Sequence, residues 1–150
     1  MKAKFAISFF LLAVASQKII AEEKLRPLIE VVAQEQSLHM YNYVFQRCSG
    51  LMLEISLRAG RGVQTEQAKQ FSELMKLGYE QFAFLSADLI SQIKKRAKDD
   101  PRNTNEALDV IMKLQNKYFD EMEEYYTLTG NSIDEKAQSD LTLCNSILQN

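Results

Sequence analysis

Histidine is almost missing from this chain, and that scarcity excludes several kinds of active site. His39 is the only histidine among 150 residues. A carboxylate-bridged di-metal bundle needs two Glu-x-x-His pairs, which one histidine cannot supply. A local Cys-His dyad is excluded as well, because His39 and Cys48 are nine residues apart and an α-helix would place them on opposite faces. We predict no metal site and no dyad of this kind.

The sequence motifs of common enzymes and cofactor-binding proteins are also lacking. The chain contains no Gly-x-x-x-x-Gly-Lys phosphate loop, no Gly-x-Ser-x-Gly elbow, no glycine-rich dinucleotide turn and no Cys-x-x-Cys-His haem attachment. Carboxylates do cluster at Asp120, Glu121, Glu123 and Glu124, and we interpret this run as the solvated side of a helix. We therefore predict a protein that is not an enzyme and has no cofactor.

Long hydrophobic runs are limited to the N-terminus. Lys2 and Lys4 flank the start of an apolar stretch that extends from Phe5 to Ala15. This stretch is shorter than the roughly 20 residues that a transmembrane helix needs, so it favours a cleaved secretory signal peptide over the alternative of a permanent membrane anchor. Small residues allow cleavage after Ala15 or after Ala21. We predict a signal peptide over residues 1–21 and a single domain over residues 22–150, located in the periplasm or secreted.

The excess of acidic charge grows when the signal peptide is removed. The whole chain has 18 basic and 20 acidic side chains. Cleavage removes two or three lysines and no acidic residue, so the mature form is distinctly anionic. A field of that sign disfavours nonspecific binding to nucleic acid or to an anionic membrane. We expect neither as a partner of the mature protein, and we leave its oligomeric state open.

Only two cysteines are present, Cys48 and Cys144. In an exported chain they favour a disulfide, although two buried free thiols or an intermolecular bridge are alternatives. Both fall on apolar helix faces, which favours the internal bridge. A bridge that closes a loop of nearly a hundred residues is worth on the order of 4 to 5 kcal/mol from chain entropy.

Proline and glycine are few, and most of them separate the apolar segments. Between these residues, apolar side chains recur every three or four positions, which is the period of an α-helix. The first helical stripe comprises Leu38, Tyr41, Phe45, Cys48, Met52, Ile55 and Ala59. The pattern leaves open whether this helix begins near Ser37 or continues unbroken from Pro27 to Ala59.

The second predicted helix begins after Thr65, a suitable N-cap. Its inward stripe comprises Phe71, Met75, Gly78, Phe82, Leu85, Leu89 and Ile93. Its end carries the cations Lys94, Lys95, Arg96 and Lys98, which the helix dipole favours at a C-terminus.

Capping-box spacing predicts where the last two helices begin. One opens with Asn103 and Glu106 and ends at Gly130, and the other opens with Ser132 and Glu135. The chain therefore predicts an all-α fold, an antiparallel up-and-down bundle of three long helices plus a short C-terminal helix with one disulfide.

Small residues indicate where helices approach closely. Gly78 lies on the stripe of the second helix, and a missing side chain there allows close packing. We expect Ser49 and Gly50, beside Cys48, to leave room for the last helix.

Four side chains are candidates for an interface. Tyr43 and Tyr126 lie off the apolar stripes, and tyrosines that remain exposed are good interface anchors. His39, Tyr43 and Arg47 share one polar helix side. The hypothesis that follows is an exported, non-enzymatic protein that binds another protein in the cell envelope or outside the cell.

Two other functions are weighed against this one. The alternative is a carrier of a small apolar ligand, held in the bundle interior between Gly50, Gly78 and the methionines. A hydrolase that uses the scattered carboxylates is the least favoured.

One short motif gives the chain a resemblance to other proteins. The run Arg-Cys-Ser-Gly-Leu-Met-Leu begins at Arg47, follows a signal sequence and precedes a second cysteine near the C-terminus. In this layout the chain resembles small exported bacterial helical proteins of unknown function. The resemblance implies a helical protein of the envelope or periplasm, and it implies no activity.

Overall fold

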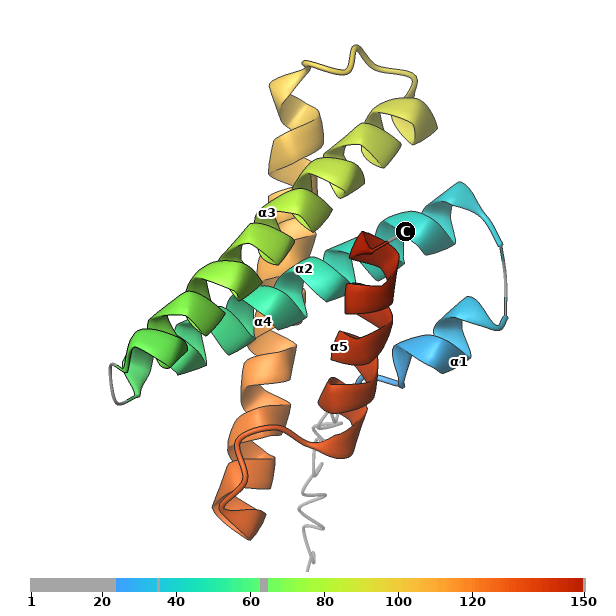
Figure 1. Cartoon of the computed structure of the whole chain (residues 1–150). Helices are drawn as coiled ribbons and strands as arrows, with labels where there is room; N and C mark the ends of the chain where they lie inside the picture. Colours follow the sequence, from blue (N-terminus) through green and yellow to red (C-terminus); the bar gives the residue numbers. More distant parts are fainter. Residues whose placement is uncertain (1–23, 35, 63–64, 150) are drawn as a thin grey trace, which may run out of the picture.

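A computed structural model describes residues 24–34, 36–62 and 65–149, which form helices and connecting turns (Figure 1). The elements are α1 (Leu28–Val32), α2 (Leu38–Arg61), α3 (Glu66–Lys94), α4 (Pro101–Thr129) and α5 (Glu135–Leu148). The described ranges contain no β-strand, which confirms the predicted all-α bundle. The predicted signal peptide and both cleavage positions lie outside the described residues.

Helix α2 is the centre of the bundle and contacts each of the other four helices. It forms an antiparallel pair with α3, while α4 crosses this pair and α5 lies beside α2 (Figure 1). Serines hold the α2–α3 pair together: the Ser56 hydroxyl donates to the Ser72 carbonyl and the Ser49 hydroxyl donates to the Tyr79 carbonyl, each at 2.9 Å. Small polar side chains at this contact allow the two backbones to approach closely.

The first predicted helix is interrupted, which resolves the open question of its start. Helix α1 ends at Val32, and α2 begins at Leu38, where the Ser37 hydroxyl accepts a hydrogen bond from the Met40 amide at 3.1 Å. An N-cap of this kind satisfies one of the amides that have no partner inside the helix. The short helix α1 is therefore an element beyond the three long helices and one short helix that we predicted.

Two predicted helix starts were wrong by a few residues. Helix α4 begins at Pro101 with Asp100 as its N-cap, and α5 has Asp134 as its N-cap. Asn103 instead lies buried inside α4, where its side-chain amide donates to the Ala97 carbonyl at 2.8 Å. In both cases an aspartate adjacent to the helix competes successfully with the predicted cap, since carboxylates accept strongly from first-turn amides. The N-cap Thr65 of α3 and the end of α4 at Gly130 are as predicted.

The predicted stripe of α2 is right in its C-terminal half and wrong near its start. Leu38 and Tyr41 are 46% and 41% exposed, whereas Met40 and Val44 are buried. The reason is that the segment before α2 packs on the side of Met40 and Val44, in one core cluster with Leu25 and Leu28. The apolar periodicity of α2 could not identify this side, because the segment that covers it lies mostly outside a regular helix.

The disulfide between Cys48 and Cys144 joins the middle of α2 to α5, with the two Cα atoms 5.5 Å apart. This confirms the predicted pairing.

The small residues beside Cys48 face other helices than we predicted. A Cβ atom on Gly50 would lie 2.9 Å from the Gln115 amide nitrogen of α4, so Gly50 allows close approach of α4, and Ser49 faces α3. The prediction that they make room for the last helix is wrong.

The space over Gly78 is filled by the sulfur of Met52. Close packing at Gly78 is therefore confirmed. Gly50 and Gly78 were expected to line an interior ligand cavity, but protein atoms occupy the space beside both glycines.

Candidate functional site: a basic groove above a buried ion-pair network

A buried ion pair connects α2 to α5 one helical turn from the disulfide. The side chains of Arg47 and Asp140 are both 0% exposed, with the Arg47 Nη2 and Asp140 Oδ2 atoms 2.5 Å apart. Tyr118 of α4 completes the cluster: its hydroxyl accepts from Arg47 Nη2 at 2.7 Å and donates to Asp140 Oδ2 at 2.6 Å. One polar cluster therefore holds three helices together.

The charges in this cluster compensate each other. Burial raises the pKa of the Tyr118 hydroxyl well above its ordinary value, so this group stays protonated and donates to Asp140. For Arg47, burial acts against the charged form, but the neighbouring Tyr118 and Asp140 outweigh it and raise the guanidinium pKa. The cluster thus holds a guanidinium and a carboxylate that are fully hydrogen bonded, the condition under which buried charges are tolerated.

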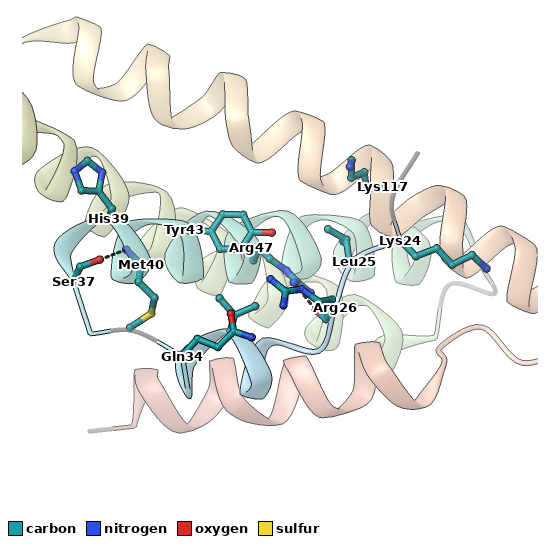
Figure 2. Close-up of a pocket in the computed structure, with 11 residues that line it drawn as sticks. Lys24, Leu25, Arg26, Gln34, Ser37, His39, Met40, Tyr43, Arg47 and Lys117 are labelled. Carbon is teal, nitrogen blue, oxygen red and sulfur yellow. Dashed lines mark hydrogen bonds between the residues drawn. The ribbon is translucent and has the colours of Figure 1, made fainter. Parts of the chain in front are cut away.

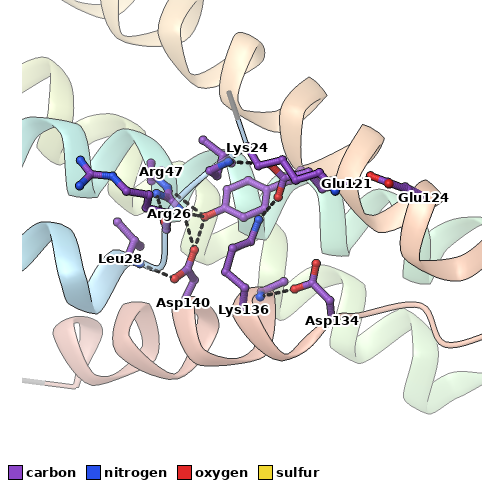
Figure 3. A network of polar contacts seen from close by, with 12 residues as sticks. Lys24, Arg26, Leu28, Arg47, Glu121, Glu124, Asp134, Lys136 and Asp140 are labelled. Atoms are coloured by element: carbon purple, nitrogen blue, oxygen red, sulfur yellow. Dashed lines mark hydrogen bonds and ion pairs between the residues drawn. The ribbon is translucent and has the colours of Figure 1, made fainter. Parts of the chain in front are cut away.

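Residues 24–28, which we call the N-terminal strap, complete the network through backbone atoms (Figure 3). The Leu28 amide donates to Asp140 Oδ1 at 2.7 Å, and Arg47 Nη1 donates to the Arg26 carbonyl at 2.6 Å. The Leu25 amide donates to a Glu121 carboxylate oxygen at 2.7 Å. Because backbone groups and the buried leucines hold the strap, the side chains of Lys24 and Arg26 remain at the surface.

Lys136 of α5 extends the network on the side of α4. It forms an ion pair with Glu121, and its ammonium nitrogen lies 5.3 Å from the centre of the Tyr118 ring. Burial and, next, the charge of Arg47 lower the Lys136 pKa to about 8, while the charge of Asp140 acts in the opposite direction. Lys136 is therefore charged at neutral pH.

The acidic run on α4 is less solvated than we predicted. Glu121 is only 14% exposed and binds both the strap and Lys136. Glu123 pairs with Arg58 at 3.0 Å and Glu124 pairs with Lys24 at 2.8 Å. These three carboxylates stabilise the contacts of α4 with its neighbours, and the expectation of a wholly solvated side was wrong because the strap and α5 pack there.

Above the network, between α1, α2 and α4, lies an open groove of about 420 Å³, which we call the basic groove (Figure 2). Its basic lining residues are Lys24, Arg26, His39, Arg47 and Lys117. Its other lining residues are Leu25, Val31, Gln34, Ser37, Met40 and Tyr43. No lining residue that the structure describes is acidic.

The geometry of the groove follows from the elements below it. The Tyr43 ring and Arg47 lie on α2 at its floor, with the guanidinium carbon 5.9 Å from the ring centre. His39 and Ser37 lie at one end, where the first turn of α2 begins, and Lys24 and Arg26 of the strap lie at the other (Figure 2). The N-terminal end of a helix adds a partial positive charge. The groove therefore offers hydrogen-bond donors and positive charge.

Three of the four predicted interface residues meet in this groove. His39 is exposed, Tyr43 is half-buried, and the buried Arg47 forms part of the groove floor. Arg47 was expected on a polar helix side, but the strap and the neighbouring helices bury it. Tyr126 is 51% exposed and does not line the groove.

Asp140 was not predicted as a site residue, although the sequence contained a signal for it. An aspartate between Ala137 and Cys144 falls on the apolar side of α5, and a charge in that position requires a buried partner.

Searches for other kinds of site and for relatives gave no further indication of function. Among the described residues, no three His, Cys, Asp or Glu side chains gather in a way that could hold a metal ion. No helix in the described part of the chain combines the length and the hydropathy needed to cross a bilayer. Comparisons with protein-family models, with curated proteins and with solved structures found no match.

Proposed function

We propose that this chain is an exported, non-enzymatic protein that binds another protein, and that the basic groove receives a segment of that partner. The observation that carries the proposal is an open groove of about 420 Å³ above a floor held by a buried ion pair and a disulfide. Pockets for small molecules usually have volumes of roughly 300 to 1,000 Å³ and are largely formed before the ligand arrives, so a groove of this size has room for a short segment of a partner. A floor that does not have to be ordered on binding lowers the entropic cost of association.

Two observations support export to the periplasm or the outside of the cell. The bridge between Cys48 and Cys144 belongs to oxidising compartments, and the N-terminal sequence has the layout of a signal peptide. N-terminal sequencing of the protein recovered from its own host tests this part. We expect the mature chain to begin after Ala15 or after Ala21, and a chain that retains residues 1–21 would contradict export by cleavage.

Native mass spectrometry of the untagged protein from the exported fraction tests for the partner. We expect a species heavier than the processed, oxidised monomer that separates into this chain and a second protein. A mass difference as small as a lipid or metabolite would instead favour the carrier, and a bare monomer under every growth condition would contradict both.

Site-specific photo-crosslinking tests the groove itself. A benzoylphenylalanine residue in place of Tyr43 should form an adduct of one discrete mass in the host. The matched control replaces Phe84, which is 62% exposed on α3 and does not line the groove. Adducts from position 84 but not from position 43 would move the binding site away from the groove.

A further inference from the structure

The chemistry of the basic groove goes beyond a general ability to bind protein. We propose that the groove binds an acidic segment of the partner and recognises its carboxylates; this inference rests on the function proposed above. The first observation is the contrast in charge. The whole chain carries more acidic than basic side chains, yet five lining residues of the groove are basic and none that the structure describes is acidic.

The basic side chains differ in how far they are already neutralised. Arg47 is paired with the buried Asp140 and serves the floor. Lys24 pairs with Glu124, but the two side chains are 71% and 54% exposed, and pairs this exposed are weak enough to exchange partners. Arg26 and His39 are exposed and form no ion pair with any described residue. Positive charge is thus available at the strap end of the groove, and the exposed imidazole of His39 adds a hydrogen-bonding group at the other end.

Backbone contacts of the strap fix the position of Arg26, and none of them uses the Arg26 side chain. Its carbonyl accepts from Arg47, and the amides on either side of it, those of Leu25 and Leu28, donate to Glu121 and Asp140. The guanidinium of Arg26 therefore extends from an anchored backbone. An arginine held in this way suits a carboxylate, because its planar fork of donors matches the two oxygens.

The shape of the groove favours a peptide over a single ion. Basic side chains occur at two separate ends, His39 near the start of α2 and Arg26 with Lys24 on the strap, with the half-buried Tyr43 between them (Figure 2). An extended segment with more than one carboxylate can contact both ends, whereas a single small anion can contact only one. The net negative charge of the whole chain disfavours nonspecific binding of acidic ligands.

The test is an NMR titration of the mature, oxidised protein with a capped peptide of alternating aspartate and glycine. We expect shifts of the backbone amides of His39, Tyr43 and Arg26, and weaker binding as salt is added. The control peptide has asparagine in place of each aspartate. Equal binding of the two peptides would overturn the inference, as would displacement of the acidic peptide by an equal concentration of inorganic phosphate.

Matched protein variants locate the contact. Arg26→Gln should weaken binding of the acidic peptide by a factor of about two to five, the effect of losing one exposed ion pair. Lys76→Gln makes the same change of charge at an exposed position of α3 that does not line the groove. Equal weakening by the two variants would show that binding depends on net charge alone and would overturn the groove as the site.

The outcomes also separate this inference from the function on which it rests. If the partner cross-links at position 43 but the acidic peptide binds no better than its asparagine control, the proposed function stands and the carboxylate inference fails. If the peptide binds at the groove but no partner protein is found, the site chemistry stands and the proposed function fails.

Discussion

Asp140→Asn is the substitution that the buried network makes most informative. The carboxylate is inaccessible to solvent and pairs with Arg47 at 2.5 Å. It also accepts hydrogen bonds from the Tyr118 hydroxyl at 2.6 Å and from the Leu28 amide at 2.7 Å. Asparagine keeps the shape and one acceptor oxygen but removes the negative charge. Arg47 would then remain buried without a counter-charge.

The expected magnitude follows from that uncompensated charge. Breaking a buried ion pair by removing one partner typically costs about 3 to 5 kcal/mol. The total free energy of unfolding of a domain is only about 5 to 15 kcal/mol, so the loss is a large share of the stability. The substitution also removes an acceptor that holds the strap, and we expect faster hydrogen exchange at the Leu28 amide.

Urea unfolding of the oxidised protein at neutral pH measures the effect. The matched control is Asp109→Asn, the same change at an exposed position of α4, which should alter the free energy of unfolding by less than about 0.5 kcal/mol. A second variant combines Asp140→Asn with Arg47→Met and removes both charges. It should be more stable than Asp140→Asn alone, because no unpaired charge is left in the interior.

Two results would refute this reasoning. A loss below about 1 kcal/mol for Asp140→Asn would mean that the pair is solvated or unimportant. A double variant whose loss equals the sum of the two single losses would mean that the side chains do not interact energetically.

Three further predictions concern other parts of the fold. Cys48→Ser removes a cross-link between residues 96 positions apart and should lower stability by up to about 4 to 5 kcal/mol; a melting temperature equal to that of the oxidised parent would show that the bridge is idle. Gly50→Ala should destabilise despite its better helix propensity of about 1 kcal/mol, because the new Cβ atom would lie 2.9 Å from the backbone of α4. Gly60→Ala meets its nearest atom at 3.8 Å and should not destabilise, so equal urea midpoints for the two variants would contradict the packing argument. The hydrogen bonds from Arg102 lower the Asp100 pKa from 3.8 to about 2, so the stability that they contribute is present above pH 4 and is lost between about pH 4 and pH 2; an NMR titration that leaves this pKa unchanged in Arg102→Gln would contradict the assignment.

Charged side chains on helices are where prediction from the sequence failed most often. Neither Arg47 nor Asp140 was expected in the interior, yet both are buried. A charge is normally assigned to solvent because burial is costly, and that rule fails when a partner from a distant helix compensates it. Arg47 and Asp140 are 93 residues apart, and local periodicity contains no information on such a pair.

The candidate site shows the same limit. His39, Tyr43 and Arg47 were grouped correctly because they share one side of a single helix. Lys24, Arg26 and Lys117 were not predicted to join them, since they come from the strap and from α4. The docking of the strap onto the buried network and the packing of α4 on α2 bring these positive charges to the same groove.

The sequence by itself determined the helical class, the disulfide pairing and some of the helix ends. These properties depend on the spacing of apolar residues, on the presence of only two cysteines, and on local caps such as Thr65 and Gly130. Tertiary structure alone decided which side of α2 is covered near its start, which charges are buried and where the basic groove lies. Those features depend on contacts between segments that are far apart in the chain, and such contacts form only when the helices pack.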